Sequence, residues 1–157
     1  MRIALPVLTA ILIGGAGAAS AQSAQSPIMQ QLEAFLGNGN GDYFWPEGRL
    51  VNQVSAGLSM PDEALKEHPI TLKSGETLKT GFRLHSGDER TAVIFGADNK
   101  VSAVGILNFK CSKKGCRKKR VLTIFLRNRD QEKEQVLSKW SEIEGGVEQT
   151  EVILVNS

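Results

Sequence analysis

Hydrophobic residues recur along the chain with two different periods, and each period predicts one kind of element. Over residues 27–36, apolar side chains three or four positions apart predict a helix, with Ser26 as its N-terminal cap and Pro27 at its first position. Residues 77–84 instead alternate apolar with polar side chains, which predicts a β-strand with one solvated face. A turn is predicted at residues 86–88.

Further strands are predicted at residues 91–95, 101–109 and 121–126, and the last two carry apolar residues on both faces, which is typical of central strands. A second amphipathic helix follows, with Asn128 as its predicted cap. A final strand at 151–155 can lie parallel to the strand that precedes this helix. The order α-β-β-β-β-α-β predicts an α+β fold: a mainly antiparallel sheet of about five strands with the helices packed on one face.

The start of the chain has the layout of an export signal. A short basic start precedes an apolar run over residues 3–13, which leads to small residues ending at Ala21. The run is shorter than the roughly 20 residues that a membrane span needs. We therefore expect residues 1–21 to be cleaved and residues 22–157 to form a single periplasmic or secreted domain, with no transmembrane span in the mature chain.

The chain has two cysteines, Cys111 and Cys116, in the connection between two predicted strands. Two cysteines in an exported protein are expected to pair, so we predict a disulfide that closes a hairpin tip. A thiol-redox function is a third alternative for this pair. Such proteins normally carry C-x-x-C at the start of a helix, whereas here four residues separate the cysteines and the flanks are strands.

Positive charge gathers at the same tip. Residues 110–129 hold nine basic residues and no acidic one, although the formal net charge of the whole chain is +2. Such a density of like charge favours an anionic partner. A solvated edge that discourages strand pairing is the competing interpretation. The predicted partner-binding residues are Lys110, Lys113, Lys114, Arg117, Lys118, Lys119 and Arg120.

The expected partner is an anionic envelope component or an acidic protein surface. Nucleic acid is not favoured, because no aromatic side chain stands among these basic residues for a base to stack on. A separate aromatic cluster, Tyr43, Phe44 and Trp45, is either a plug for one end of the core or an exposed binding patch. Both alternatives stay open from the sequence.

Catalytic motifs are missing from the sequence. The two histidines, His68 and His85, lack the spacing of metal ligands, and there is no nucleophile elbow, phosphate loop or paired carboxylate motif. We therefore expect no catalytic residue, no metal and no cofactor. The first hypothesis is a non-enzymatic envelope protein that binds through a disulfide-closed basic hairpin.

The C-x4-C tip, followed by Arg120-Val121-Leu122, is similar in layout to the hairpin of periplasmic inhibitors of vertebrate lysozyme, which also carry a signal peptide. The resemblance covers residues 93–126 and implies an alternative function, inhibition of a secreted or cell-wall-degrading enzyme. The tip of that family carries a His that enters the enzyme's cleft, whereas this tip has Lys113 and Lys114. The family also continues in strands where this chain turns helical. We interpret the likeness as convergence.

Overall fold

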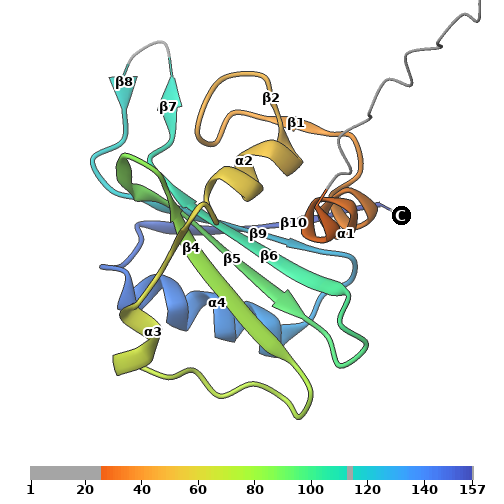
Figure 1. Cartoon of the computed structure of the whole chain (residues 1–157). Helices are drawn as coiled ribbons and strands as arrows, with labels where there is room; N and C mark the ends of the chain where they lie inside the picture. The colour runs from red at the N-terminus through yellow and green to blue at the C-terminus, as the bar shows by residue number, and fades with distance from the viewer. Residues whose placement is uncertain (1–25, 113–114, 157) are drawn as a thin grey trace, which may run out of the picture.

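This computed structural model describes residues 26–112 and 115–156, which form four helices and ten strands (Figure 1). The helices of this part are α1 (Pro27–Leu36), α2 (Leu50–Ala56), α3 (Ala64–Glu67) and α4 (Gln131–Ile143). Its strands are β1 (Asn40–Gly41), β2 (Gly48–Arg49), β3 (Met60–Pro61), β4 (Thr77–Arg83), β5 (Ser86–Phe95), β6 (Val101–Asn108), β7 (Cys111–Ser112), β8 (Gly115–Cys116), β9 (Val121–Leu126) and β10 (Gln149–Leu154). The predicted signal peptide lies outside the described residues.

Six strands form one sheet in the order β10-β9-β6-β5-β4-β3. Neighbouring strands are antiparallel except β9 and β10, which α4 connects and which run parallel, with Val121 opposite Gln149 and Leu126 opposite Leu154. This confirms the predicted α+β class with a mainly antiparallel sheet. The sheet has one strand more than expected, because the two-residue β3 pairs with β4. No helix in the described residues is long and apolar enough to cross a membrane.

Helices cover both faces of this sheet, so the predicted packing on one face is wrong. Helices α1 and α2 pack on the face that bears Val93 and Phe125, whereas α4 places Leu137 and Trp140 against the face that bears Ile94 (Figure 1). Successive side chains of a strand point to opposite faces. The central strands are apolar on both faces, so each face needs a covering layer. The sequence did not resolve α2, because a seven-residue element is too short to show a helical period.

A glycine in β6 lets α4 lie close to the sheet. A Cβ atom added at Gly105 would stand 3.1 Å from Cδ2 of Leu137 and 3.4 Å from Cζ3 of Trp140. Helix α4 itself is capped by Asp130, whose carboxylate accepts a hydrogen bond from the Lys133 backbone N–H at 3.2 Å. The predicted cap, Asn128, lies two residues too early.

The turn between β4 and β5 also differs from the prediction at residues 86–88. Strand β5 already begins at Ser86, and the chain reverses at Leu84 and His85. His85 has a φ of 65°, a left-handed conformation that is uncommon for residues other than glycine. The local sequence did not predict this conformation. As a result, Asp88 and Glu89 belong to a long β4–β5 hairpin and not to a loop.

Candidate binding site at the cysteine hairpin

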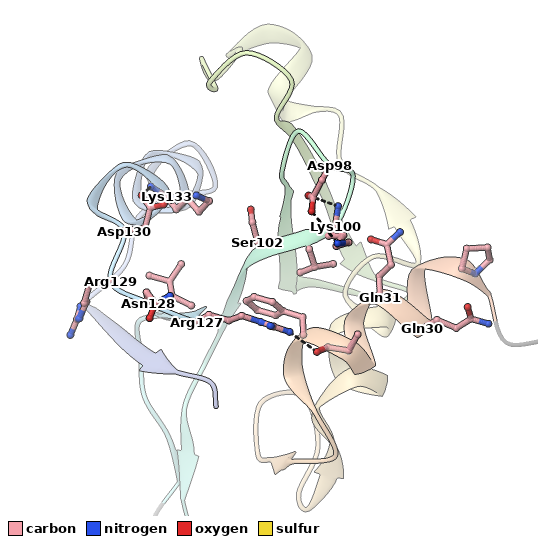
Figure 2. A pocket seen from close by; sticks show the side chains of 15 residues that line it. Gln30, Gln31, Asp98, Lys100, Ser102, Arg127, Asn128, Arg129, Asp130 and Lys133 are labelled. Atoms are coloured by element: carbon pink, nitrogen blue, oxygen red, sulfur yellow. Dashed lines mark hydrogen bonds and ion pairs between the residues drawn. The ribbon is translucent and has the colours of Figure 1, made fainter. Parts of the chain in front are cut away.

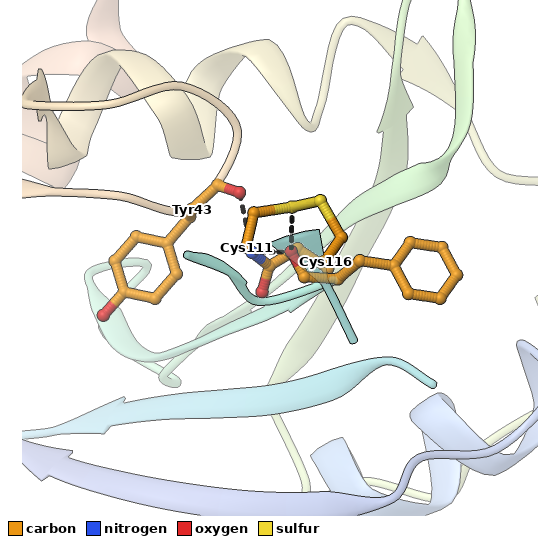
Figure 3. The surroundings of a disulfide bond; sticks show 5 residues. Tyr43, Cys111 and Cys116 are labelled. Atoms are coloured by element: carbon orange, nitrogen blue, oxygen red, sulfur yellow. Dashed lines mark hydrogen bonds between the residues drawn. A yellow bond between two sulfur atoms is a disulfide. The ribbon is translucent and has the colours of Figure 1, made fainter. Parts of the chain in front are cut away.

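Strands β7 and β8 form a small hairpin of their own within the connection from β6 to β9. Cys111 lies opposite Cys116 in the register, and the two form the predicted disulfide (Figure 3). At the base of the hairpin, the Arg117 N–H donates to the Lys110 carbonyl at 2.8 Å. Lys113 and Lys114, two of the predicted binding residues, lie outside the described residues. We call the segment from Lys110 to Arg120 the cysteine hairpin.

Two basic residues brace the cysteine hairpin against β10. Lys110 forms an ion pair with Glu151. Arg117 donates from Nη1 to Oε1 of Gln149 at 3.0 Å. Both partners come from the acidic C-terminal part of the chain, which the parallel pairing of β10 with β9 brings alongside. These two members of the predicted binding set are therefore engaged within the protein.

The other described members of the set differ in their surroundings. Arg120 donates to the backbone carbonyl of Glu144, at the end of α4. Lys118 and Lys119 are exposed, and among the described residues no ion pair or side-chain hydrogen bond holds either of them. Together with Arg120 and Gly145 they line a depression of about 440 Å³. Among the described basic residues of the hairpin, Lys110 alone has a carboxylate counterion, since Arg117 and Arg120 donate to uncharged groups. Lys118 and Lys119 are the two whose side chains no described group holds.

One buried side chain, Gln53 of α2, holds the loop between β1 and β2. Its Oε1 accepts hydrogen bonds from the backbone N–H groups of Tyr43 at 3.0 Å and Phe44 at 2.7 Å. Its Nε2 donates to the carbonyls of Gly48, at 2.9 Å, and Gly41. Gln53 is fully buried, so one side chain satisfies four backbone groups that would otherwise lack partners.

The aromatic cluster on this loop is divided between core and surface. Phe44 is buried, whereas Tyr43 and Trp45 are half-buried and pack against the core. The Tyr43 carbonyl accepts a hydrogen bond from Asn108 Nδ2 beside the disulfide (Figure 3). Burial, and then two nearby carboxylates, raise the pKa of Tyr43 to about 12, so its phenol stays neutral. The cluster therefore packs on the core, and its role as a binding patch stays a prediction.

A groove of about 520 Å³ opens where this loop, the β4–β5 hairpin and the cysteine hairpin meet. It joins two features that the sequence presented separately, the aromatic cluster and the cysteine pair. Sequence reasoning missed its acidic residues, because β-strand pairing brings them there from distant positions. Its lining includes four aromatic residues, Tyr43, Phe44, Trp45 and Phe109, three acidic ones, Asp42, Asp88 and Glu89, and one basic one, Arg117. One side of the cysteine hairpin is therefore mainly acidic and aromatic and the other mainly basic, with Asp88 and Phe109 lining both depressions.

Two buried carboxyl groups share one arginine near the base of this site. Arg90 Nη1 lies 2.8 Å from Oδ2 of Asp62 and 2.5 Å from Oε2 of Glu144. The two acidic side chains are 5% and 3% exposed. Two carboxyl groups this close to one guanidinium influence each other's ionisation. We interpret this acid pair as structural, because its burial leaves no room for a substrate.

Environment separates the acidities of the two carboxyl groups. Burial, followed by the hydrogen bond with Asp62, raises the pKa of Glu144 to about 7. Burial opposes ionisation of Asp62 as well, but hydrogen bonds with Glu144, the Ala64 N–H and Arg90 outweigh it and lower the pKa of Asp62. Glu144 is therefore the more readily protonated of the two carboxyl groups.

Neither histidine takes part in the ion pairs of these groups. His68 ends α3 and His85 lies in the β4–β5 turn, and both are exposed. Over residues 26–112 and 115–156, no group of three or more His, Cys, Asp or Glu side chains is placed to hold a metal ion.

The fold and this site define a small α+β protein with a disulfide-closed hairpin between a basic and an acidic surface. Comparison with known protein families, curated proteins and solved structures gave no match. Its function has to be inferred from the geometry of its own residues.

Replacing Gln53 with Met keeps most of the side-chain volume and removes four hydrogen bonds. We expect the free energy of unfolding to fall by about 2–4 kcal/mol, because buried backbone groups of the loop lose their partners. Urea denaturation measures it. The matched control is Asn52→Met, at an exposed position of the same helix, with an expected change below about 0.5 kcal/mol. Equal losses in the two variants would contradict the role of Gln53.

The acid pair predicts that stability falls as pH rises from about 5 to 8. The folded protein binds the Glu144 proton with a pKa of about 7, above its ordinary value of 4.5. Its contribution is therefore full at low pH and is lost as pH rises through 7, on the order of 2 kcal/mol.

Glu144→Gln tests this dependence, because the Gln amide donates to Asp62 at every pH as the protonated carboxyl does. We expect the free energy of unfolding of this variant to lose its dependence on pH, whereas Glu142→Gln, at an exposed position of α4, should keep that dependence. Denaturation at several pH values gives the three slopes. The same slope in wild type and in Glu144→Gln would show that the proton lies elsewhere.

Proposed function

We propose that this protein is a binding module in which Lys118 and Lys119 of the cysteine hairpin contact an anionic partner. The observation that supports this is the division of the basic residues. Lys110, Arg117 and Arg120 are bound within the protein, whereas Lys118 and Lys119 are exposed and unpaired within the described ranges. Two neighbouring ammonium groups repel each other, and an anionic partner removes that repulsion.

The construction of the hairpin suits it to binding. The disulfide joins β7 to β8, and the contacts with Glu151 and Gln149 fix its base on β10. A binding segment that is ordered before it meets its partner loses less conformational entropy on binding. The same contacts keep Arg117 away from the basic surface, so the lysines that remain define the contact.

The partner that we favour is a phosphate-bearing component of the cell envelope. A lysine ammonium is a compact point charge that binds phosphate without a fixed geometry, which suits a surface of many head groups. The predicted export of residues 22–157 would bring the hairpin to that surface, and disulfides persist in such oxidising compartments. Binding to an acidic protein surface is the other outcome of the test.

Inhibition of a secreted or cell-wall-degrading enzyme is a second candidate. The groove beside the hairpin favours it, because partly exposed aromatic side chains such as Tyr43 and Trp45 supply the contacts that dominate protein interfaces. A stoichiometric complex with an enzyme that survives high salt would support inhibition. Binding that is lost at high salt supports the anionic partner, since salt screens exposed charges.

Replacing Lys118 and Lys119 together with Gln should weaken binding to vesicles that contain phosphatidylglycerol. We expect a loss of about tenfold or more, because each lysine near an anionic surface contributes about 1 kcal/mol. Co-sedimentation at low salt measures it, with phosphatidylcholine vesicles as the neutral reference.

The matched control for this experiment is the double variant Lys79→Gln with Lys139→Gln. It removes the same charge from exposed positions elsewhere and should change binding by less than about twofold. The envelope proposal fails if wild type ignores the anionic vesicles or if both double variants bind them equally well. A high-salt-resistant complex with an acidic protein would then replace it.

Replacing Cys111 and Cys116 together with Ser separates the structural role of the disulfide from the thiol-redox alternative. A structural crosslink that closes so short a loop should contribute about 2 kcal/mol to the free energy of unfolding, and the variant should lose it. Denaturation measures this loss, and incubation of wild type with glutathione measures thiol exchange. Rapid exchange together with unchanged stability of the variant would support the redox function instead.

A further inference from the structure

A second groove, whose lining side chains are shown in Figure 2, lies at the opposite end of β9 from the cysteine hairpin. It opens between α1, the β5–β6 connection and the start of α4, and its volume of about 800 Å³ falls within the roughly 300–1,000 Å³ of small-molecule sites. The six residues of β9 place the two ends about 20 Å apart. The basic segment 110–129 therefore contributes to two separate surfaces, and Arg127 belongs to the second.

Ion pairs compensate the other basic side chains around this groove. The pairs are Lys100 with Asp98 at 3.4 Å, Lys133 with Asp130 at 2.5 Å, and Arg129 with Glu134 at 3.2 Å. The hydrogen bond from Lys133 lowers the pKa of Asp130, which keeps that pair charged on both sides. Among the described residues, no carboxylate pairs with Arg127. One guanidinium thus remains as the uncompensated charge of the groove.

Two contacts hold the Arg127 side chain in place while leaving its charge unmatched. Its Nη2 donates to the backbone carbonyl of Ala34 at 2.8 Å (Figure 2). Its Cζ atom lies 5.7 Å from the centre of the Phe35 ring, a cation–π contact. These contacts occupy one of the five N–H donors of a guanidinium. The remaining donors are available to a ligand that carries oxygen atoms.

The surroundings of Arg127 are apolar on one side and polar on the other. Pro27 and Ala34 provide exposed apolar surface in its lining, above the buried residues Phe35, Val101 and Leu126. Ser102 also lines it, and since its hydroxyl donates to the Ile94 carbonyl at 3.1 Å, its oxygen can accept a hydrogen bond. An inorganic anion would leave the apolar lining uncovered, and a neutral molecule would leave the guanidinium unmatched.

We propose that this groove binds a small organic anion, with a phosphate or carboxylate group on Arg127 and an apolar body against Pro27 and Ala34. The site is independent of the cysteine hairpin and of its partner. A guanidinium binds either oxyanion through two parallel hydrogen bonds, and the apolar body adds affinity in proportion to the area it buries.

Octyl phosphate is the probe. Octanol, which has the apolar chain without the phosphate, and inorganic phosphate, which has the anion without the chain, are the controls. We expect octyl phosphate to bind the purified protein more tightly than either half and to shift the amide NMR signals of Gln31, Ser102 and Asn128. Arg127→Gln should raise its dissociation constant about tenfold or more, because a charged hydrogen-bond pair is lost. Arg127→Lys keeps the charge but not the paired donors, so its dissociation constant for octyl phosphate should lie between those of wild type and Arg127→Gln.

Two further variants keep the test decisive. Ala34→Trp narrows the groove from an exposed position of α1 without removing charge and should also weaken binding. The double variant Lys118→Gln with Lys119→Gln should leave it unchanged, which separates this site from the hairpin. The proposal is wrong if octanol binds as tightly as octyl phosphate, if the shifts cluster at Lys118 and Lys119, or if monomeric octyl phosphate does not bind.

Discussion

Strands β5, β6 and β9 carry apolar side chains on both faces, and the arrangement of the whole molecule follows from the need to cover both. Every residue of β9 is buried. Leaving either face open would cost about 25 cal/mol for each Å² of apolar surface exposed to water. Helices α1 and α2 cover one face, while α4 crosses the other and returns the chain as the parallel strand β10. Both candidate sites lie at the ends of β9, where the covering layers stop.

Local patterns were enough to predict the elements that this constraint uses. The continuous apolar run of β9, the apolar stripe of α4 and the pair of close cysteines can each be recognised within about a dozen residues of sequence. The hydrogen-bond partners of Gln53 cannot be recognised in this way. Its four hydrogen bonds to the aromatic loop depend on how α2 docks, and a lone Gln in a short apolar segment carries no signal of it. The same holds for Asp62, Arg90 and Glu144, which meet across three distant segments.

In the candidate sites, too, local features could be predicted from the sequence, whereas contacts between distant segments could not. The sequence places a dense basic run around the cysteines, and the structure confirms the disulfide at that place. Which of these cationic side chains are held within the protein depends on Gln149 and Glu151, more than thirty residues further along the chain. The second groove was missed because its decisive contacts join Arg127 to Ala34 and Phe35, at the other end of the sequence.

The strong segregation of charge along the sequence is largely undone by the fold. The parallel register of β9 with β10 sets Thr123 beside Glu151, and this pairing carries the acidic C-terminal segment back along the basic one. Lys110 finds its counterion there, and Arg129 finds another in α4. Lys118 and Lys119 at one end of β9, and Arg127 at the other, have no counterion among the described residues, and Arg117 and Arg120 donate only to uncharged groups. One basic stretch of the sequence thus contributes to two separate surfaces.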